Sequence, residues 1–157
     1  MSRIDFAKNL VKGKIAETIF AQMHREAGGF TVLEFGYEKI IPELVQQGYS
    51  ENNLTIKTLR TAPDFAVINQ KTKNVKLIEV KYMRILNLSY VLFDAQRMRE
   101  SWNPSFLFVA TLDGFYFDSI EIIIKNKGKI SRLKDPQISL ELQNKYLKIL
   151  TDFEGNN

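Results

Sequence analysis

The sequence of 157 residues contains no cysteine, and no uninterrupted apolar run approaches the roughly 18 residues that a membrane-spanning helix needs. The absence of cysteine excludes disulfides and thiolate metal sites, and it is compatible with a reducing compartment. The first residues, MSRIDFAKNLVKGKIAE, lack an apolar core of signal-peptide length. We therefore expect a cytoplasmic protein with no membrane partner.

The composition is that of an ordinary globular protein. Hydrophobic residues make up 45% of the chain and charged residues 25%, and a chain of this length can bury a substantial core. There is no internal repeat, low-complexity tract or linker, which predicts one domain over residues 1–157. The net charge of +4 permits a nucleic-acid partner without requiring one. No zinc finger, basic zipper or phosphate-binding glycine loop can be recognised.

The hydrophobic pattern predicts an α/β fold with a mixed sheet flanked by helices. Apolar residues at three- and four-residue steps predict helices over 4–27, 88–102 and 138–153. Alternating or continuous apolar runs predict strands over 30–37, 64–69, 75–82 and 105–112, and a further strand within 115–124. The polar QKTKN between the second and third strands predicts a hairpin turn. Within 40–61 we expect a short helix, a polar break and a short strand.

The stretch PDFAVINQKTKNVKLIEVK carries charged groups on two predicted strands. Side chains on a strand alternate faces, so Glu79 and Lys81 point the same way, and Asp64 can lie beside them if the two strands pair. Buried charges are costly unless they pair or bind a metal. Two carboxylates suit Mg²⁺, and a neighbouring lysine can orient or deprotonate a water or stabilise charge on a phosphoryl group. Together these groups could catalyse phosphodiester hydrolysis.

Pro63-Asp64 followed by Glu79-Val80-Lys81 resembles the signature of the PD-(D/E)xK nuclease superfamily, which has the restriction-endonuclease-like fold. Glu17, in GKIAETIF, and Gln96, in FDAQRM, are similar to a glutamate and a glutamine that many of these nucleases carry on flanking helices. The order of these residues is most similar to that in Holliday junction resolvases and related small nucleases. The resemblance covers residues 13–112. It departs from the compact resolvases in the long segment 38–62, and from the RecB-like subgroup at Glu100, where that subgroup has a tyrosine.

The resemblance implies a Mg²⁺-dependent DNA endonuclease, with Mn²⁺ able to substitute and with branched or structured DNA as one substrate class. Asp64 and Glu79 would bind the metal, Glu17 would assist, Lys81 would position the attacking water, and Gln96 would join the catalytic set. Cutting both strands of a duplex or junction needs two sites, which a homodimer would supply.

Basic clusters are candidate phosphate contacts, although such runs are usually solvated faces. They comprise Lys71, Lys73, Arg97, Lys125, Lys127 and Lys129. Other interpretations stay open. The chain could be a non-catalytic nucleic-acid-binding module that keeps the fold, or a subunit that depends on a recognition-protein partner. His24 is expected to be an ordinary surface residue of the first helix.

Overall fold

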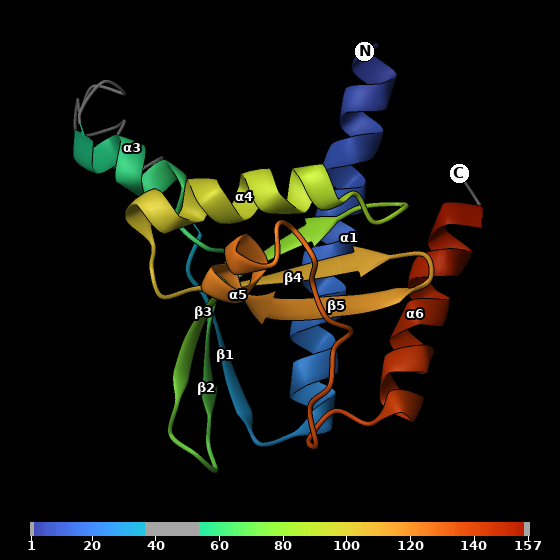
Figure 1. The fold of residues 1–157 in the computed structure, drawn as a ribbon. Coiled ribbons are helices and arrows are strands. Elements are labelled where there is room, and N and C mark those ends of the chain that lie inside the picture. The colour runs from blue at the N-terminus through green and yellow to red at the C-terminus, as the bar shows by residue number, and fades with distance from the viewer. Residues whose placement is uncertain (1, 37–53, 156–157) are drawn as a thin grey trace, which may run out of the picture.

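The computed structural model describes residues 2–36 and 54–155 and has a mixed α/β architecture (Figure 1). One five-stranded sheet has the order β1-β2-β3-β4-β5. The strands are β1 (Phe30–Glu34), β2 (Phe65–Asn69), β3 (Val75–Tyr82), β4 (Phe106–Thr111) and β5 (Gly114–Ser119). The helices are α1 (Arg3–Ala27), α3 (Leu54–Arg60), α4 (Leu88–Ser101), α5 (Ile120–Lys125) and α6 (Leu140–Gly155). The predicted fold class, a mixed sheet flanked by helices, is confirmed.

The sheet is antiparallel except at its centre. β1 pairs with β2, and β2 pairs with β3, both antiparallel. β3 and β4 are parallel, and β4 and β5 are antiparallel. A parallel pair cannot be joined by a tight turn, so the chain needs a crossover between its two strands. α4 is that crossover, and it packs on the face of the sheet that carries Leu107 and Val109 of β4.

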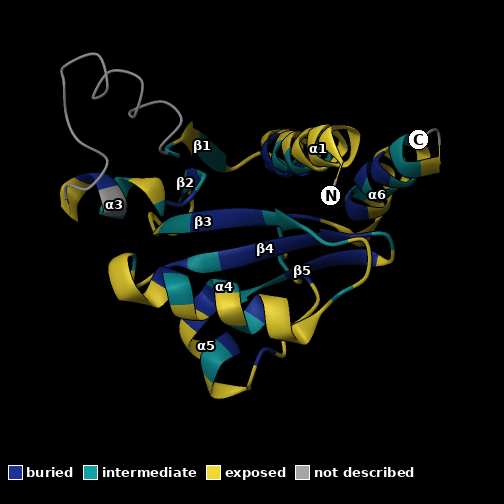
Figure 2. Ribbon diagram, turned by 90° about the horizontal axis from the view of Figure 1, so that it is seen from above, coloured by how far each residue is buried: buried dark blue, intermediate teal, exposed yellow. Residues whose placement is uncertain are grey.

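The helices cover both faces of the sheet in two layers (Figure 2). α1 and α6 lie over one face, where Phe20, Met23 and Phe108 are fully buried. α4 and α5 lie over the other face, where Val91 and Met98 pack against β4. The buried layers account for the strongly apolar character of the predicted central strands.

α1 begins and ends where the sequence predicts. Ser2 caps its first turn in a reciprocal arrangement with Asp5, and Gly28 follows its end with a φ of 77°, a left-handed conformation that glycine adopts without steric cost. Only the second half of the predicted apolar stripe is buried. The first half projects beyond the sheet (Figure 1), with exposed side chains at Ile4, Phe6, Leu10 and Val11. In the described ranges neither α1 nor any other helix is both long and apolar enough to cross a membrane.

Three local predictions differ from the structure. β1 ends at Glu34, three residues before the predicted end at Tyr37, which lies outside the described residues. Residues 54–60 form α3, where a strand was expected; residues 40–53 of that predicted segment are also outside the described part. α5 was not predicted, because IEIII is rich in β-branched residues that favour strands. Ser119 starts this helix by accepting a hydrogen bond from the Ile122 amide.

His24 is buried, and the expectation of a surface histidine was wrong. Its Nδ1 lies 2.8 Å from the carbonyl oxygen of Phe20, and its ring packs against Phe20 and Phe30. Burial lowers the pKa of His24 to about 4, with the Phe20 carbonyl and Asp135 opposing the shift. A neutral imidazole therefore forms part of the aromatic core.

Candidate active site

The site lies just beyond the first residue of β2, where β3 continues without β2 as a neighbour. The pairing of β2 with β3 ends at Phe65 and Ile78, whereas β3 extends to Tyr82 and is paired there with β4 alone. The notch beside β3 is filled in part by Asp64, the residue before β2. Its Oδ2 accepts a hydrogen bond from the Val80 amide at 2.8 Å. The register places Asp64 opposite Glu79, so the two carboxyl groups converge as their spacing on paired strands predicts.

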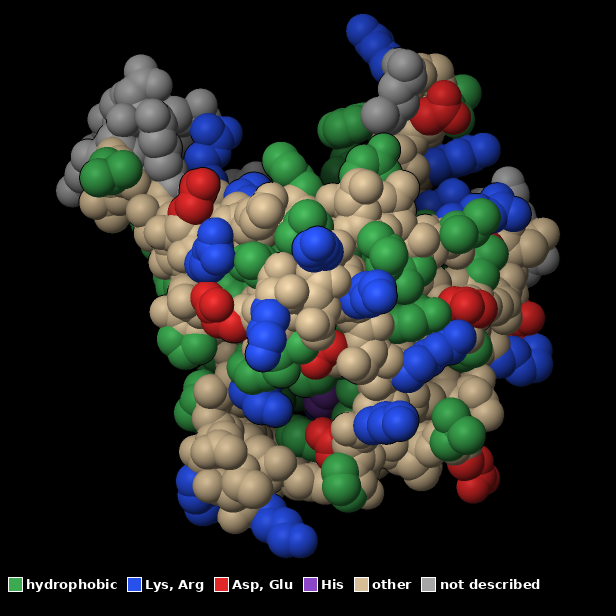
Figure 3. Space-filling model, viewed as in Figure 1, with side chains coloured by type: hydrophobic (Ala, Val, Ile, Leu, Met, Phe, Trp, Pro, Cys, Tyr) green, Lys and Arg blue, Asp and Glu red, His purple; other side chains and the backbone are tan. Residues whose placement is uncertain are grey.

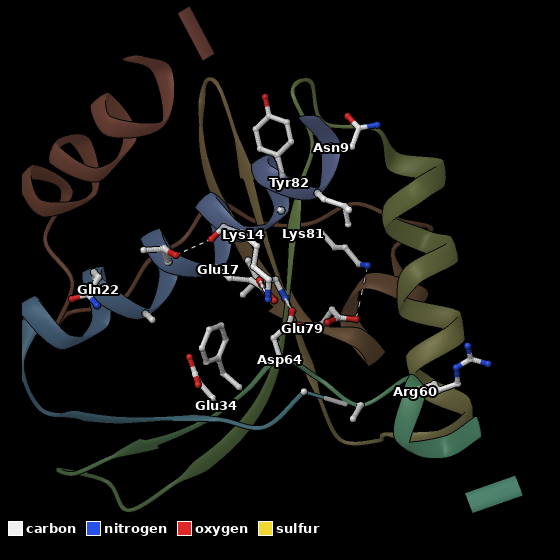
Figure 4. Close-up of a pocket in the computed structure, with 18 of the residues that line it drawn as sticks. Asn9, Lys14, Glu17, Gln22, Glu34, Arg60, Asp64, Glu79, Lys81 and Tyr82 are labelled. Carbon is white, nitrogen blue, oxygen red and sulfur yellow. Dashed lines mark hydrogen bonds and ion pairs between the residues drawn. The ribbon is translucent and has the colours of Figure 1, made fainter. Parts of the chain in front are cut away.

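Three carboxyl groups from three elements meet in this notch (Figure 4). Glu79 points from β3 and is 6% exposed. Asp64 shares side-chain hydrogen bonds with Glu79 and with Glu17, which α1 brings across β3. Ile78 and Val80 point to the opposite face and pack in the core beneath α1. The strand alternation predicted from the sequence therefore puts the charges on one side and the apolar groups on the other.

Burial is the main cause of the raised pKa values of Asp64 and Glu17. It raises the pKa of Asp64 to about 7, and the hydrogen bond to Glu79 and the charge of Glu79 add to the shift. Burial also raises the pKa of Glu17 to about 7, and Asp64 adds to that shift. These directions mean that Glu17 can donate to Asp64 when it is protonated, and that Asp64 can donate to Glu79 when it is protonated. Protons thus hold together three carboxyl groups that would repel one another if all were ionised.

Two cations contact the innermost carboxylate. Nη2 of Arg97, on α4, lies 3.3 Å from Oε2 of Glu79, and Nζ of Lys81 lies 4.0 Å from the same oxygen. Arg97 also lies 3.8 Å from Oδ1 of Asp94. Burial raises the pKa of Asp94, while Lys81 and Arg97 act to lower it. The negative charge of Glu79 is therefore compensated by both β3 and α4.

A cavity of about 650 Å³ opens above these groups. Figure 4 shows α1 on one side of β3 and α4 on the other, with Lys14, Glu17, Asp64, Glu79 and Lys81 directed into the space between them. Its floor is acidic, and its walls supply Lys14, Arg25, Arg60 and Arg97. An acidic floor with basic walls can hold a cation in its centre and an anion around it.

The structure does not bring Gln96 to this site. Gln96 is exposed on α4 and does not line the cavity, whereas the next residue, Arg97, does. One position along a helix turns a side chain by about 100°, so a neighbour one residue away faces elsewhere. Sequence reasoning placed Arg97 only among phosphate contacts and missed Asp94. The apolar positions Val91, Ala95 and Met98 could have indicated which face of α4 Asp94 and Arg97 share.

The other predicted basic residues are distant from the cavity. Lys71 and Lys73 are exposed in the turn after β2, and β2 separates them from Asp64 by its full length, roughly 15–20 Å. Lys125, Lys127 and Lys129 are exposed at and after the end of α5. That segment packs against the start of α4, where Gly128 approaches the Leu88 carbonyl. Among the predicted phosphate contacts, Arg97 alone lines the cavity.

The donor set fits a divalent cation. Asp64 and Glu79 are adjacent hard oxygen donors, of the kind that Mg²⁺ prefers. Within residues 2–36 and 54–155, however, no group of three or more His, Cys, Asp or Glu side chains is already arranged to hold a metal ion. The carboxyl groups interact in pairs, Glu17 with Asp64 and Asp64 with Glu79, and each pair raises a pKa.

Comparisons with known proteins give no assignment. No model of a known protein family matches the chain, and no curated protein matches it significantly. Inference about function therefore has to proceed from the cavity and its residues.

Proposed function

We propose that this protein is a divalent-metal-dependent nuclease that hydrolyses DNA phosphodiester bonds. The observation that carries the proposal is the meeting of Glu17, Asp64 and Glu79, from three separate elements, beside Lys81 in an open cavity. A fold has no structural reason to gather one buried and two half-buried acids, because each ionised pair repels. The resemblance of Pro63-Asp64 and Glu79-Val80-Lys81 to the PD-(D/E)xK signature points the same way.

Asp64 and Glu79 would hold Mg²⁺ or Mn²⁺, and Glu17 would assist beside Asp64. The bound ion would neutralise phosphate charge and lower the pKa of a coordinated water. Any proton held by Asp64 or Glu17, whose pKa values are raised to about 7, would have to leave, because metal-binding carboxylates are deprotonated. The same arrangement therefore explains how the fold tolerates these acids before an ion is bound.

Lys81 and Arg97 supply positive charge where a phosphodiester would lie. The Lys81 ammonium is at the outer limit of ion pairing with Glu79 and its side chain is 35% exposed, so it can turn toward an attacking water or a phosphoryl oxygen. Arg97 is held by Glu79 and Asp94, and its guanidinium can bind a phosphate through two parallel hydrogen bonds. In hydrolysis a water oxygen bonds to phosphorus, the bond to the leaving oxygen breaks, and that oxygen takes a proton.

The test is cleavage of a panel of DNA substrates with and without Mg²⁺. Asp64→Asn and Glu79→Gln keep the shape of each side chain and remove its charge. Each should reduce Mg²⁺-dependent cleavage by roughly 100-fold or more, because metal ligands are lost. Asp152→Asn removes an exposed carboxylate on α6 and serves as the control, with circular dichroism to verify folding. Full activity in either site variant would overturn the proposal.

A second candidate is a nucleic-acid-binding module without catalysis. The observation that favours it is the lack, among the described residues, of a preformed three-ligand metal group. This candidate predicts DNA binding with no cleavage at any Mg²⁺ or Mn²⁺ concentration.

The oligomeric state and the partners of the protein would determine which DNA substrates it cuts. A homodimer would let two sites cut both strands of a duplex or junction, and a recognition-protein partner would supply sequence specificity. Light scattering of the isolated protein with and without DNA tests the first arrangement. Affinity capture with cleavage assays on the recovered complex tests the second.

A further inference from the structure

Two exposed aromatic side chains lie on the same side of α4 as Arg97, which lines the cavity. Val91, Ala95 and Met98 mark the buried face of α4. At about 100° per residue, Tyr90 falls on the face between Asp94 and Arg97, and Phe93 falls about 40° from Arg97. Tyr90 is 65% exposed and Phe93 is 64% exposed. Because Asp94 and Arg97 face the site, Tyr90 continues that line of side chains and Phe93 flanks it.

The wall that α1 contributes to the cavity is open at Gly13. Leu10 and Gly13 of α1 line the cavity, and Leu10 is 58% exposed. A Cβ added at Gly13 would meet nothing within 4 Å. Glycine inside a helix is destabilising relative to alanine, and no neighbouring group requires it here. The position leaves room for a ligand to approach the α1 backbone closely.

We propose that Tyr90 and Phe93 stack on unpaired bases of a nucleic-acid strand whose phosphate is held by Lys81 and Arg97. This inference rests on the proposed function and specifies its substrate class. The substrate is single-stranded nucleic acid, or the single-stranded arm, flap or end of a longer molecule.

The chemistry of the wall favours a nucleotide over a protein partner. Exposed rings beside an arginine and a lysine match a ligand that combines flat apolar faces with regularly spaced negative charge. Five cations line the cavity, from α1, α3, β3 and α4. Figure 3 shows hydrophobic side chains lying among Lys and Arg on the face that carries α4. An apolar protein surface would bring no negative charge to these cations, whereas each phosphate of a nucleotide strand does.

The same geometry selects against an intact duplex. Bases inside a duplex are stacked on one another, so their faces are closed to a protein ring. Side chains that protrude from a helix can take up a base only where the strand is unpaired or its bases are splayed apart. Exposed rings on the side of α4 that carries Arg97 would therefore favour strands that reach the cavity unpaired.

The decisive experiment measures stacking without cleavage. Oligodeoxythymidine that carries one 2-aminopurine is titrated with protein in Ca²⁺ in place of Mg²⁺, with oligouridine and a blunt duplex as parallel probes. Tyr90→Leu and Phe93→Leu keep apolar bulk and remove the ring, Tyr90→Trp restores a ring, and Ile122→Ala removes an exposed apolar side chain on α5. The deoxythymidine and uridine arms distinguish DNA from RNA as the source of the strand.

We expect the wild type to bind the single strand more tightly than the duplex and to change 2-aminopurine fluorescence. Each leucine variant should bind the single strand about 5- to 150-fold more weakly, the range that follows from one lost base–aromatic stack. Tyr90→Trp and Ile122→Ala should bind as the wild type does.

Two failures are distinguishable. If Tyr90→Leu and Phe93→Leu leave single-strand affinity and fluorescence unchanged, the stacking inference is overturned, even if Mg²⁺-dependent cleavage of duplex DNA is found. If stacking is lost in the leucine variants but no substrate is ever cleaved, the stacking inference stands and the nuclease proposal fails. Equal binding of duplex and single strand by all variants would also overturn the inference.

Discussion

The Val80 amide donates a hydrogen bond to Oδ2 of Asp64 at 2.8 Å, and this bond joins the two halves of the candidate site across the end of β2. It takes the place of a sheet hydrogen bond that β2 does not supply, since the pairing of β2 with β3 ends at Phe65 and Ile78. Asp64 is thereby held beside Glu79 by the backbone of the residue between Glu79 and Lys81.

The stability of the metal-free protein should depend on the ionisation of Asp64. Burial raises the pKa of Asp64 from 3.8 to about 7, so the folded state holds this proton at pH values where the unfolded chain has lost it. The stabilising contribution is full below about pH 4 and is lost as the pH rises through 7. Thermal unfolding of the wild type and Asp64→Asn in a chelator, across that range, measures it. The variant should gain relative stability as the pH rises.

His24 makes a comparison with the wild type necessary. Its lowered pKa, about 4, gives stability that is present above 6.5 and lost as the pH falls toward 4, the opposite direction to Asp64. Since both proteins contain His24, its titration cancels in the difference between them, which reports Asp64 together with the part of the Glu17 shift that Asp64 causes. A difference that does not vary with pH would contradict the buried, protonated carboxyl group.

Metal binding should release protons from the site. Asp64 and Glu17 both have a raised pKa of about 7, and metal ligands bind in the deprotonated form. Near pH 6 we expect release approaching one proton from each group, and almost none above pH 8. Calorimetric titration with Mn²⁺ in buffers of different ionisation enthalpy counts the protons. Metal affinity that is independent of pH between 6 and 8 would argue against this arrangement.

Arg97 and Lys81 should differ in what they contribute. Arg97 is the closer partner of buried Glu79, so Arg97→Gln should lower the free energy of unfolding by about 1–3 kcal/mol, the usual cost of an unsatisfied buried group. Lys81→Gln should change stability little and reduce turnover more than metal affinity. Urea unfolding and metal titration of both variants separate the two roles. Loss of metal affinity together with activity in Lys81→Gln would assign Lys81 to holding the carboxylates.

Gly13 should favour DNA binding and lower the free energy of unfolding. Because an added Cβ meets nothing within 4 Å, Gly13→Ala should raise the free energy of unfolding by about 0.5–1 kcal/mol. Gly13→Leu should also fold but should weaken DNA binding, since its side chain enters the cavity. Gly155→Ala, at the last residue of α6, is equally uncrowded and should leave DNA binding unchanged. Unaltered binding by Gly13→Leu would place the ligand elsewhere.

Two exposed cations allow a matched test of where phosphates bind. Arg25 lines the cavity, whereas Lys125 lies at the end of α5. Arg25→Gln should flatten the slope of log affinity against log salt by about 0.7 on single strands or 0.9 on duplex DNA, one contact's worth of released counterion. Lys125→Gln should leave the slope unchanged. The reverse result would support the sequence-based prediction for Lys125, Lys127 and Lys129 and move the binding surface to α5.

The sequence by itself determined the elements that carry the charges. Two-residue alternation in VKLIEVKY was enough to put Glu79 and Lys81 on one face, because side chains of any strand alternate. Three- and four-residue spacing in 4–27 was enough to predict α1, and its glycine pair fixed the end. These are local properties, and tertiary contacts had only to agree with them. The α/β class followed from the order of such elements.

Only the tertiary structure decided which groups meet and how their charges are balanced. The pairing of β2 with β3 begins only at Phe65, α1 brings Glu17 beside Asp64, and α4 turns Arg97 inward and Gln96 outward. All three depend on packing between distant segments. The exposed first half of α1 shows that periodicity does not predict burial, since its apolar spacing equals that of the buried half. Periodicity specifies a face of a helix, whereas burial of that face requires a partner that the spacing does not encode.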